Sequence, residues 1–412
     1  MKYYPLRPIQ RWMVDSHFEK AKSTMMNIGG LYKLSATIDM EHLAEAINFV
    51  LERHDIFRCR FVFHPETSDL CQHFEGELEK VFVEQLSDAK FKKRMEKLRE
   101  PYYLIDKPLY RIYLMQTPRA KYIYADFYHA IIDGVSIAYL LWNEIDATYR
   151  GRKNPKALSY ADYVASEAAV PAEELAEGHE YWKKMLSGFD SKKHLLPTKI
   201  QGDAKWIKGD FNYEFKNLME EFFRTTRINE NNYFLGASML ALAKLTGSGE
   251  SVVSWTHNGR ISMRERRLIG LMLVQYPCAW DFHENITIEE FLNRLEGQVR
   301  TGIKYRKSLG IIYDEGIEDN CVTFIFQKEL YLDFILADTL AMPIYLPPNE
   351  ISAAENSLDI EVYATEMGKY DLALHYDASR YVEKDMRRFA ETLNKILIEM
   401  KNPNAKVSEI LA

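Results

Sequence analysis

Strand-like and helix-like runs alternate in the chain between residues 30 and 63. The run GLYKLSAT begins at Gly30, MEHLAEAINFVLERH follows from Met40, and FRCRFVF ends at Phe63. Apolar residues in the middle run recur at the spacing of one helical face, and Asp39 precedes it as the expected N-cap. Because strand, helix and strand follow one another within about forty residues, the sequence predicts an α/β layer structure.

Two more strands are predicted further along the first half. PLYRIYLM from Pro108 and KYIYADFY from Lys121 are rich in tyrosine and isoleucine, and their residues alternate with period two. The second of these strands runs into the motif YHAIIDG, which covers residues 128–134. A helix is predicted over 136–150, and Gly151 ends it.

The second half of the chain also alternates predicted helices and strands. Residues 165–187 are rich in alanine and glutamate, and the change in composition makes them the expected linker. Beyond it the sequence predicts a helix over 230–244 with Asn229 as its cap, strands that begin at Ser251, Cys321 and Leu358, and a last helix over 383–401. We therefore expect two subdomains, 1–170 with the YHAIIDG motif and 171–412.

Charge and cysteine content argue against several classes of protein. The net charge of −7 and the lack of a basic stripe argue against a nucleic-acid binder. The N-terminus lacks the apolar core of a signal peptide, and the most apolar helical stretch, 235–245, is too short to span a bilayer. The cysteines form no CxxC pair, so neither a zinc site nor a disulfide framework is expected; they are Cys59, Cys71, Cys278 and Cys321. These features predict a cytoplasmic protein with reduced thiols, no bound metal, and neither nucleic acid nor membrane as a partner.

The motif YHAIIDG places titratable side chains where a strand turns into a helix. The unperturbed pKa of His129 lies near neutrality, so this residue could take a proton from an amine or an alcohol, or it could be a hydrogen-bonded core histidine. Asp133 fits the N-cap of the following helix and could also anchor the turn through an arginine, while Gly134 lets the backbone bend. Tyr128 is expected to be a packing aromatic. On these seven residues alone, the catalytic and the structural interpretation both stay open.

The motif resembles the HHxxxDG signature of the condensation domains of nonribosomal peptide synthetases and their acyltransferase relatives. Other segments resemble motifs of the same family in the same order: PIQRWMVD from Pro8, RHDIFRCRF from Arg53, SYADYVASE from Ser159, NGR from Asn258 with IGLMLVQYP from Ile269, and YDLALHYDASRY from Tyr370. The resemblance therefore spans essentially the whole chain.

The resemblance implies a fold of two chloramphenicol-acetyltransferase-like subdomains, arranged as a V-shaped pseudo-dimer around a central tunnel. His129 stands at the position of the second signature histidine, which implies that it is the catalytic residue in the middle of that tunnel. Asp133 and Gly134 would be structural, with Asp133 paired to an arginine; Arg58 is the first candidate for this partner and Arg260 the second. Candidates for lining the tunnel are Ser136, Arg260, Gln275 and Gln327.

The activity that the resemblance implies is acyl transfer. A free-standing condensation-type acyltransferase would move an acyl or aminoacyl group from the phosphopantetheine thioester of a separate carrier protein to an amine, forming an amide in nonribosomal peptide-type biosynthesis. No cofactor is expected to bind the chain itself. Two alternatives stay open: an ester-forming O-acyltransferase that uses a carrier or coenzyme A thioester, and a non-catalytic docking module. The second alternative stays open because Tyr128 replaces the first signature histidine.

Overall fold

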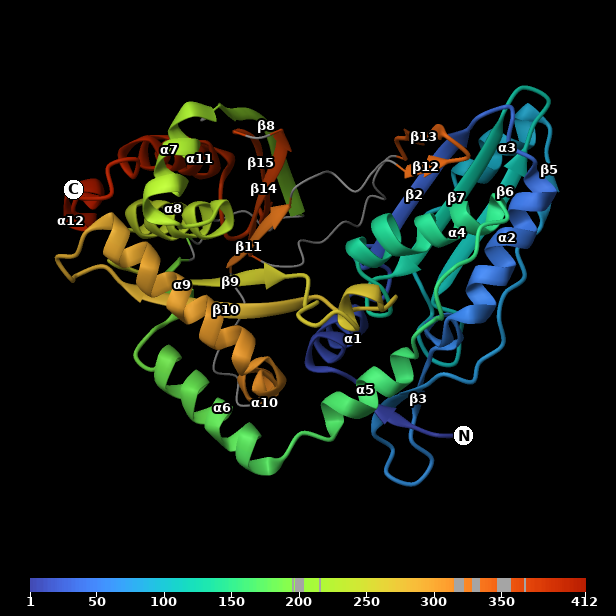
Figure 1. Cartoon of the computed structure of the whole chain (residues 1–412), viewed down its shortest axis with the longest axis horizontal. Helices are drawn as coiled ribbons and strands as arrows, with labels where there is room; N and C mark the ends of the chain where they lie inside the picture. Colours follow the sequence, from blue (N-terminus) through green and yellow to red (C-terminus); the bar gives the residue numbers. More distant parts are fainter. Residues whose placement is uncertain are drawn as a thin grey trace. The chain divides into compact units, whose positions relative to one another are not determined.

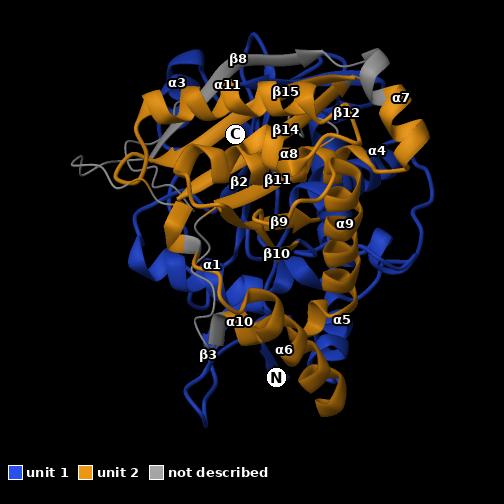
Figure 2. Cartoon of the chain, turned by 90° about the vertical axis from the view of Figure 1, so that its left-hand side faces the viewer, with its two compact units in different colours: residues 1–170, 258–273, 331–352 blue, residues 171–257, 274–330, 353–412 orange. Residues whose placement is uncertain are grey.

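The computed structural model divides the chain into two α/β units (Figure 1). The structure describes residues 1–194, 196, 204–214, 216–314, 322–327, 334–346, 357–366 and 368–412. Unit 1 comprises 1–170, 258–273 and 331–352, and unit 2 comprises 171–257, 274–330 and 353–412 (Figure 2).

Unit 1 is built on a six-stranded sheet of order β12-β13-β2-β7-β6-β5. Its strands are β2 (Asn27–Leu34), β5 (Val83–Gln85), β6 (Tyr110–Gln116), β7 (Lys121–Tyr128), β12 (Phe334–Leu336) and β13 (Thr339–Ile344). Neighbouring strands are antiparallel except for β5 and β6, which are parallel. A smaller sheet of order β1-β4-β3 contains β1 (Tyr4–Pro5), β3 (Arg60–Phe63) and β4 (Leu70–His73).

Helices pack on both faces of the larger sheet of unit 1. Helices α2 (Met40–Arg53) and α4 (Trp142–Tyr149) cover one face and α3 (Asp88–Met95) covers the other. The unit also contains α1 (Pro8–Glu19) and α5 (Tyr160–Ala168), of which α5 contacts β1 of the smaller sheet. Helices α2 and α4 share the main core of this unit with Ile123, Ala125 and Phe127 of β7. Phe91 of α3 packs in a separate cluster with Tyr124, which is also on β7. Because alternate residues of a strand point to opposite faces, β7 is buried on both sides, and the residues at its end are held in one position.

Unit 2 is built on a second six-stranded sheet, of order β10-β9-β11-β14-β15-β8. Its strands are β8 (Ala204–Glu214), β9 (Glu250–His257), β10 (Val274–Asp281), β11 (Val322–Gln327), β14 (Leu358–Glu366) and β15 (Lys369–Asp377). Strand β11 is parallel to both of its neighbours, β9 and β14, and the other neighbouring pairs are antiparallel.

The helices of unit 2 are α6 (Ala172–Leu186), α7 (Lys216–Thr226), α8 (Glu230–Thr246), α9 (Ile288–Lys304), α10 (Gly310–Asp314), α11 (Glu383–Glu399) and α12 (Val407–Leu411). Helix α8 is buried along most of its length and contributes Phe234 and Leu240 to the core of this unit. Helix α11 adds Phe389 and Leu393, and β14 adds alternate residues such as Ile360 to the same core. A helix that is buried on all sides has to be apolar all round, which is why α8 shows no strong apolar stripe.

Local signals account for the ends of the main helices. Asp39 accepts hydrogen bonds from the backbone N–H groups of Glu41 and His42, at 3.1 Å each, so it is the predicted cap of α2. Asn229 caps α8 in the same way through the N–H of Asn232, at 2.8 Å. The far end of α8 is closed by Gly247, whose φ of 67° suits glycine.

The expected linker at 165–187 contains the first boundary between the two units, which falls after Val170, but its residues are largely helical. Helix α5 continues to Ala168, α6 starts at Ala172, and only 169–171 separate the two. Alanine and glutamate are strong helix formers, so the composition that suggested a linker instead builds helices. Pro171 takes the N-cap position of α6.

Two segments depart from the expected division into 1–170 and 171–412. Residues 258–273 and 331–352 belong to unit 1, although they lie far into the second half of the chain. The second of these segments supplies β13, which pairs with β2. Such pairings depend on hydrogen bonds between distant strands, so no local pattern in the sequence marks them.

Two further expectations concern the membrane and the cysteines. In the part of the chain that the structure describes, the helices are too short or too polar to cross a bilayer. Cys59, Cys71 and Cys278 are buried, and Cys321, the expected first residue of a strand, lies outside the described residues. The described part of that strand, β11, begins at Val322.

Candidate active site

The YHAIIDG motif starts at the end of the central strand β7. Tyr128 is the last residue of the strand and pairs with Asn27 of β2. The backbone N–H of His129 then donates to the carbonyl of Met26, at 2.7 Å. This bond extends the β2–β7 contact by one step and holds the backbone of His129 against the neighbouring strand.

The side chain of Tyr128 packs inside unit 1. It is 1% exposed, and its hydroxyl donates to the carbonyl of Met13 in α1, at 3.0 Å. Its ring makes edge-to-face contacts with His17, Phe61 and Tyr102. These contacts give Tyr128 the packing role that the sequence predicts.

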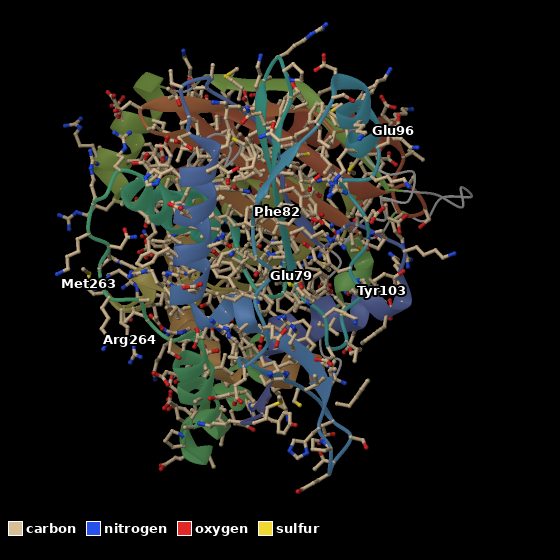
Figure 3. The ribbon with its side chains drawn as sticks, turned by 90° about the vertical axis from the view of Figure 1, so that its right-hand side faces the viewer. Glu79, Phe82, Glu96, Tyr103, Met263 and Arg264 are labelled. Atoms are coloured by element: carbon tan, nitrogen blue, oxygen red, sulfur yellow. The ribbon has the colours of Figure 1, made fainter. Side chains whose placement is uncertain are left out.

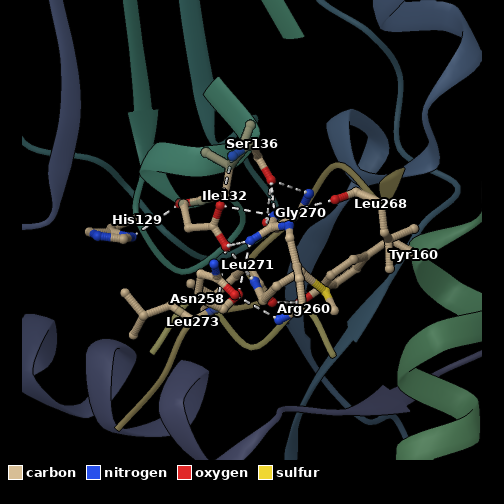
Figure 4. A network of polar contacts seen from close by, with 12 residues as sticks. His129, Ile132, Ser136, Tyr160, Asn258, Arg260, Leu268, Gly270, Leu271 and Leu273 are labelled. Carbon is tan, nitrogen blue, oxygen red and sulfur yellow. Dashed lines mark hydrogen bonds and ion pairs between the residues drawn. The ribbon is translucent and has the colours of Figure 1, made fainter. Parts of the chain in front are cut away.

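The imidazole of His129 is partly buried and has a defined tautomer. Its Nδ1 lies 3.0 Å from the carbonyl oxygen of Ile132. Since a carbonyl can only accept, Nδ1 carries the proton of the neutral ring, and Nε2 keeps its lone pair. Figure 4 shows the ring pointing away from the polar network around Arg260.

The electrostatic surroundings favour the neutral form of His129. Burial lowers its pKa from the ordinary value, while the bond to Ile132 and the charge of Asp133 act in the opposite direction. With burial dominant, the ring is an unprotonated base at neutral pH. A neutral imidazole with Nε2 available can accept a proton from a nucleophile.

Asp133 is buried and uses both carboxylate oxygens fully. Its Oδ1 accepts from the backbone N–H of Ser136, at 2.8 Å, as an N-cap would. Its Oδ2 accepts from the N–H groups of Met272 and Leu273, at 2.8 and 3.2 Å. Arg260 completes the set with a two-point ion pair, Nη1 to Oδ2 at 2.8 Å and Nη2 to Oδ1 at 3.0 Å.

The ion pair keeps Asp133 charged in spite of its burial. Burial alone would raise the pKa of the carboxyl, but the charge and hydrogen bonds of Arg260 and the backbone N–H groups of Ser136 and Met272 hold that pKa below the ordinary value. Both side chains of the pair are 3% exposed. Asp133 therefore acts both as a helix cap and as the anchor of a buried arginine.

Arg260 also binds the loop that carries it. Nη1 donates to the carbonyl oxygen of Asn258, at 3.0 Å. Nη2 donates to Ser136 Oγ, at 2.6 Å, and to the carbonyl oxygen of Leu268, at 3.3 Å. Ser136 Oγ in turn donates to the carbonyl of Gly270 and accepts from its N–H, at 2.7 and 3.0 Å. The segment 258–273 is thereby fixed to the start of the helix that follows the motif (Figure 4).

The prediction that Arg58 pairs with Asp133 is wrong. The second candidate, Arg260, is the partner. Arg58 closes a short helical turn, 55–58, and its Nη1 lies 3.5 Å from the carbonyl of Gly76. The choice between the two arginines depends on where the segment 258–273 folds, which the local sequence around either arginine does not show.

Ser136 and Arg260, two of the expected tunnel residues, are structural instead. Ser136 is 0% exposed and Arg260 is 6% exposed, and the hydrogen bonds described above satisfy them internally. Gln275 and Gln327 lie on β10 and β11 of unit 2 and are partly buried. Their place in a tunnel stays a prediction.

The IGLM segment, which begins at Ile269, forms the scaffold behind Asp133. Its resemblance to a family motif is visible in the sequence, but its contacts are not. The carbonyl of Leu271 accepts from the hydroxyl of Tyr160, at 2.7 Å, and from Arg7. Gly270 has a φ of 155°, and a Cβ at this position would lie 2.2 Å from the ring of Tyr160. The glycine before an apolar run was the available signal, since only glycine fits a backbone packed this closely on an aromatic ring.

The helix that follows the motif does not begin as a regular α-helix. Residues 136–141 form a π-helical turn that continues into α4. Such turns widen a helix by one residue and are frequent at functional sites. Among the residues that the structure describes, there is no cluster of three or more histidine, cysteine or acidic side chains arranged to hold a metal ion.

Comparisons with known proteins identify the fold and the family. The model of the condensation domain matches residues 1–412. Gramicidin S synthase 2 of Aneurinibacillus migulanus is 22% identical over 435 aligned positions, which cover 99% of this chain and 10% of that protein. The chain thus spans about a tenth of the length of this relative.

Two solved structures illustrate the similarity. The condensation domain of the monacolin K polyketide synthase MokA has a TM-score of 0.78 at 20% identity, with 99% of each chain covered. A variant of the starter condensation domain of rhizomide synthetase RzmA, in complex with C8-CoA and Leu-SNAC, has a TM-score of 0.75 at 16% identity, with 98% and 96% covered. The predicted fold class, with two chloramphenicol-acetyltransferase-like subdomains, is confirmed by these neighbours. This chain belongs to the condensation-domain family.

Proposed function

We propose that this condensation domain is an active acyltransferase that moves an acyl or aminoacyl group from a carrier-protein thioester to an amine. The observation that carries the proposal is the state of His129. Its Nδ1–H is held by the carbonyl of Ile132, so that Nε2 has the lone pair of a base. The reacting nitrogen of an acceptor would be placed at Nε2.

The proposed step is aminolysis of the thioester. The nitrogen of the amine attacks the thioester carbonyl, the new C–N bond forms, and the C–S bond breaks. His129 accepts the proton that the nitrogen loses at Nε2 and passes it to the departing thiolate. A thiolate is a good leaving group, so holding the two substrates in the correct positions supplies much of the rate.

The motif also offers a candidate for stabilising the developing negative charge on the carbonyl oxygen. Gly134 begins the helical segment that follows His129. The first N–H groups of a helix have no partner within the helix and favour an anion. The N–H of Ser136 is already bound to Asp133, so we assign this supporting role to the backbone N–H groups of Gly134 and Val135.

Binding partners of similar proteins support thioester donors. The RzmA structure was solved with C8-CoA and with Leu-SNAC. For this chain we propose a phosphopantetheine thioester on a carrier protein as donor and a small amine as acceptor, with the chain itself holding no cofactor. An O-acyltransferase that uses an alcohol acceptor or a coenzyme A thioester is the second candidate, because a neutral His129 would accept a proton from an alcohol by the same geometry.

The test supplies the purified protein with acyl thioesters on carrier proteins, the matching coenzyme A thioesters, and a panel of amines and alcohols. Mass spectrometry detects new amides or esters, and His129→Ala serves as the matched control. Amide formed from carrier thioesters and lost in the control would support the proposal. Ester as the main product, or product only from coenzyme A thioesters, would favour the second candidate. Stable binding of a synthetase protein without product from any pair would identify a docking module instead.

A further inference from the structure

Apart from the candidate active site, one surface loop of unit 1 combines exposed basic side chains with an exposed methionine. Residues 261–267, the basic loop, follow Arg260 directly. Met263 is 73% exposed and the side chain of Arg264 is 65% exposed. Figure 3 shows both residues pointing away from the ribbon. A single exposed apolar side chain is ordinary on a protein surface, so it is the charges of this loop that indicate a contact for another protein.

The basic loop is held rigid by its own hydrogen bonds. The carboxylate of Glu265, which is 8% exposed, accepts from the backbone N–H groups of Ile261 and Ser262, at 3.1 and 2.6 Å. The N–H of Glu265 donates back to Ser262 Oγ, at 3.2 Å. The ends of the loop are tied as well, because the guanidinium of Arg260 binds the carbonyl of Leu268, at 3.3 Å. A preorganised loop loses little conformational entropy when a partner binds it.

Four exposed basic residues lie in the basic loop or next to it. Arg264, Arg266 and Arg267 are exposed residues of the loop itself. Arg267 donates to the carbonyl of Lys156, at 3.2 Å, which brings a fourth exposed basic residue to the loop. Arg266 Nη1 lies 4.0 Å from the sulfur of Met263. We call Met263, Arg264, Arg266, Arg267 and Lys156 the basic patch.

The acidic residues in this region leave the basic patch with an excess of positive charge. The carboxylate of Glu265 is turned inward and is used by the loop. Among the described residues, the exposed carboxylate of Asp162 lies 4.0 Å from the guanidinium of Arg264. The whole chain has a net charge of −7, so this local excess of positive charge runs against its overall balance.

We propose that the basic patch is the docking surface for an acidic face of the carrier protein that delivers the thioester. This inference rests on the proposed function. Methionine and arginine are both enriched in protein interfaces, and the arrangement fits a partner with carboxylates around one apolar side chain. Exposed charges act mainly on the association rate and its dependence on salt, which suits a partner that has to bind and leave in every cycle.

The position of the patch connects docking to the candidate active site. The basic loop begins at Ile261, the residue after Arg260, and Arg260 is clamped to Asp133 four residues beyond His129. A carrier protein bound to the loop would therefore rest on the same rigid network that fixes the motif. The proposed docking surface and the motif of His129 are therefore connected through one hydrogen-bonded network of unit 1.

The test compares two double charge reversals. Arg264→Glu with Arg266→Glu reverses two of the four positive charges of the patch but keeps Arg267, which bonds the carbonyl of Lys156. Lys92→Glu with Lys93→Glu makes the same change in charge on exposed residues of α3 and is the matched control. Binding is measured by fluorescence anisotropy with labelled phosphopantetheinyl carrier proteins of strongly acidic and of neutral net charge. Transfer is measured with the thioester on the carrier and with the same acyl group on N-acetylcysteamine.

We expect the patch variant to bind the acidic carrier about tenfold more weakly and to show a similar rise in KM for its thioester. Its rate with the N-acetylcysteamine thioester should stay within about twofold of wild type, because the loop does not touch the reacting atoms. The α3 variant should behave as wild type. Met263→Ser is a milder change at an exposed side chain and serves as a second test in case the double variant does not fold. It should keep the fold intact and weaken carrier binding about threefold.

Several results would overturn the proposal. These are unchanged carrier binding in the patch variant, an equal loss in the α3 variant, equal binding of a DNA duplex and the acidic carrier, or an equal loss of rate with the small thioester. If the wild-type protein forms no product from either thioester, the proposed function fails. The anisotropy measurement still decides in that case whether the patch binds a carrier.

Discussion

The guanidinium of Arg260 forms a two-point ion pair with the carboxylate of Asp133, across a sequence separation of 127 residues. Both groups are buried. Asp133 also accepts from the backbone N–H of Met272 in the segment 258–273, and Arg260 also donates to Ser136 Oγ beside Asp133, so that neither is left with an isolated charge. The pair joins the helix start after His129 to the segment 258–273. The orientation of the motif therefore depends on a contact with a segment from the second half of the chain.

Removal of one member of this pair should destabilise the protein strongly. Arg260→Ala leaves the Asp133 carboxylate buried and without its counter-charge, at an expected cost of about 3–5 kcal/mol, and Asp133→Ala should have a similar effect. Arg58→Ala is the matched control and should shift the melting temperature little, because the contact of Arg58 Nη1 with the carbonyl of Gly76 is long, at 3.5 Å. Thermal and urea unfolding measure the difference. Equal losses for Arg58 and Arg260 would contradict the assignment of the pair.

His129→Ala should lower the rate by about 10²–10⁴-fold, the usual contribution of a general base, without a change in melting temperature. The pH profile gives an independent check. Burial lowers the pKa of His129 below its ordinary value of 6.5, and the neutral form is the active one, so kcat/KM should rise with pH and level off below pH 6.5. The inflection should be absent from the residual activity of the variant. Near wild-type turnover in His129→Ala would remove the residue from the mechanism.

Tyr128→Phe should retain most of the activity. The change deletes the hydroxyl that donates to the carbonyl of Met13 but keeps the ring in its packed position. The expected cost is about 1 kcal/mol of stability, since one neutral hydrogen bond is lost. Tyr128→His should also remain active. A collapse of the rate in Tyr128→Phe with a normal melting curve would show that the phenol takes part in the reaction.

Gly270→Ala should disturb the scaffold behind Asp133. The added Cβ would lie 2.2 Å from the ring of Tyr160, and the φ of 155° is unfavourable for alanine. We expect a loss of about 1–3 kcal/mol together with reduced activity. Gly297→Ala in α9 is the control: its Cβ would meet nothing within 4 Å, and alanine should stabilise the helix by about 0.5–1 kcal/mol. Unchanged stability and activity in Gly270→Ala would contradict this prediction and would mean that the backbone around Gly270 can shift without loss of stability.

Asp126 should give stability an unusual dependence on pH. Burial raises its pKa from 3.8 to about 6, against the opposing effects of Arg111 and Asn27. The folded state therefore binds a proton more tightly than the unfolded state, so this group makes the protein less stable as the pH rises from about 4 to about 6. Asp126→Asn cannot ionise, and the difference in unfolding free energy between it and wild type should grow over this range in favour of the variant. A constant difference from pH 4 to pH 7 would refute the shifted pKa.

Local patterns in the sequence determined those elements whose causes lie within a few residues. The helix after Asp39 was predictable because its apolar spacing and its cap are both local, and the structure contains both. The same holds for β7, whose alternating apolar residues are buried on both faces of the sheet. The motif at the end of β7, together with the other segments that resemble the condensation family, is enough to locate the candidate site at His129 without any tertiary contact.

Tertiary structure alone decided which distant groups meet at that site. Arg58 and Arg260 are equally plausible partners for Asp133 by residue type, and only the path of the segment 258–273 selects Arg260. The same path turns Ser136 from an expected tunnel residue into a buried contact of Gly270. β13 joins β2 by strand pairing across the two halves of the chain. The energies of such contacts depend on burial and geometry that many segments create together, so no stretch of local sequence contains them.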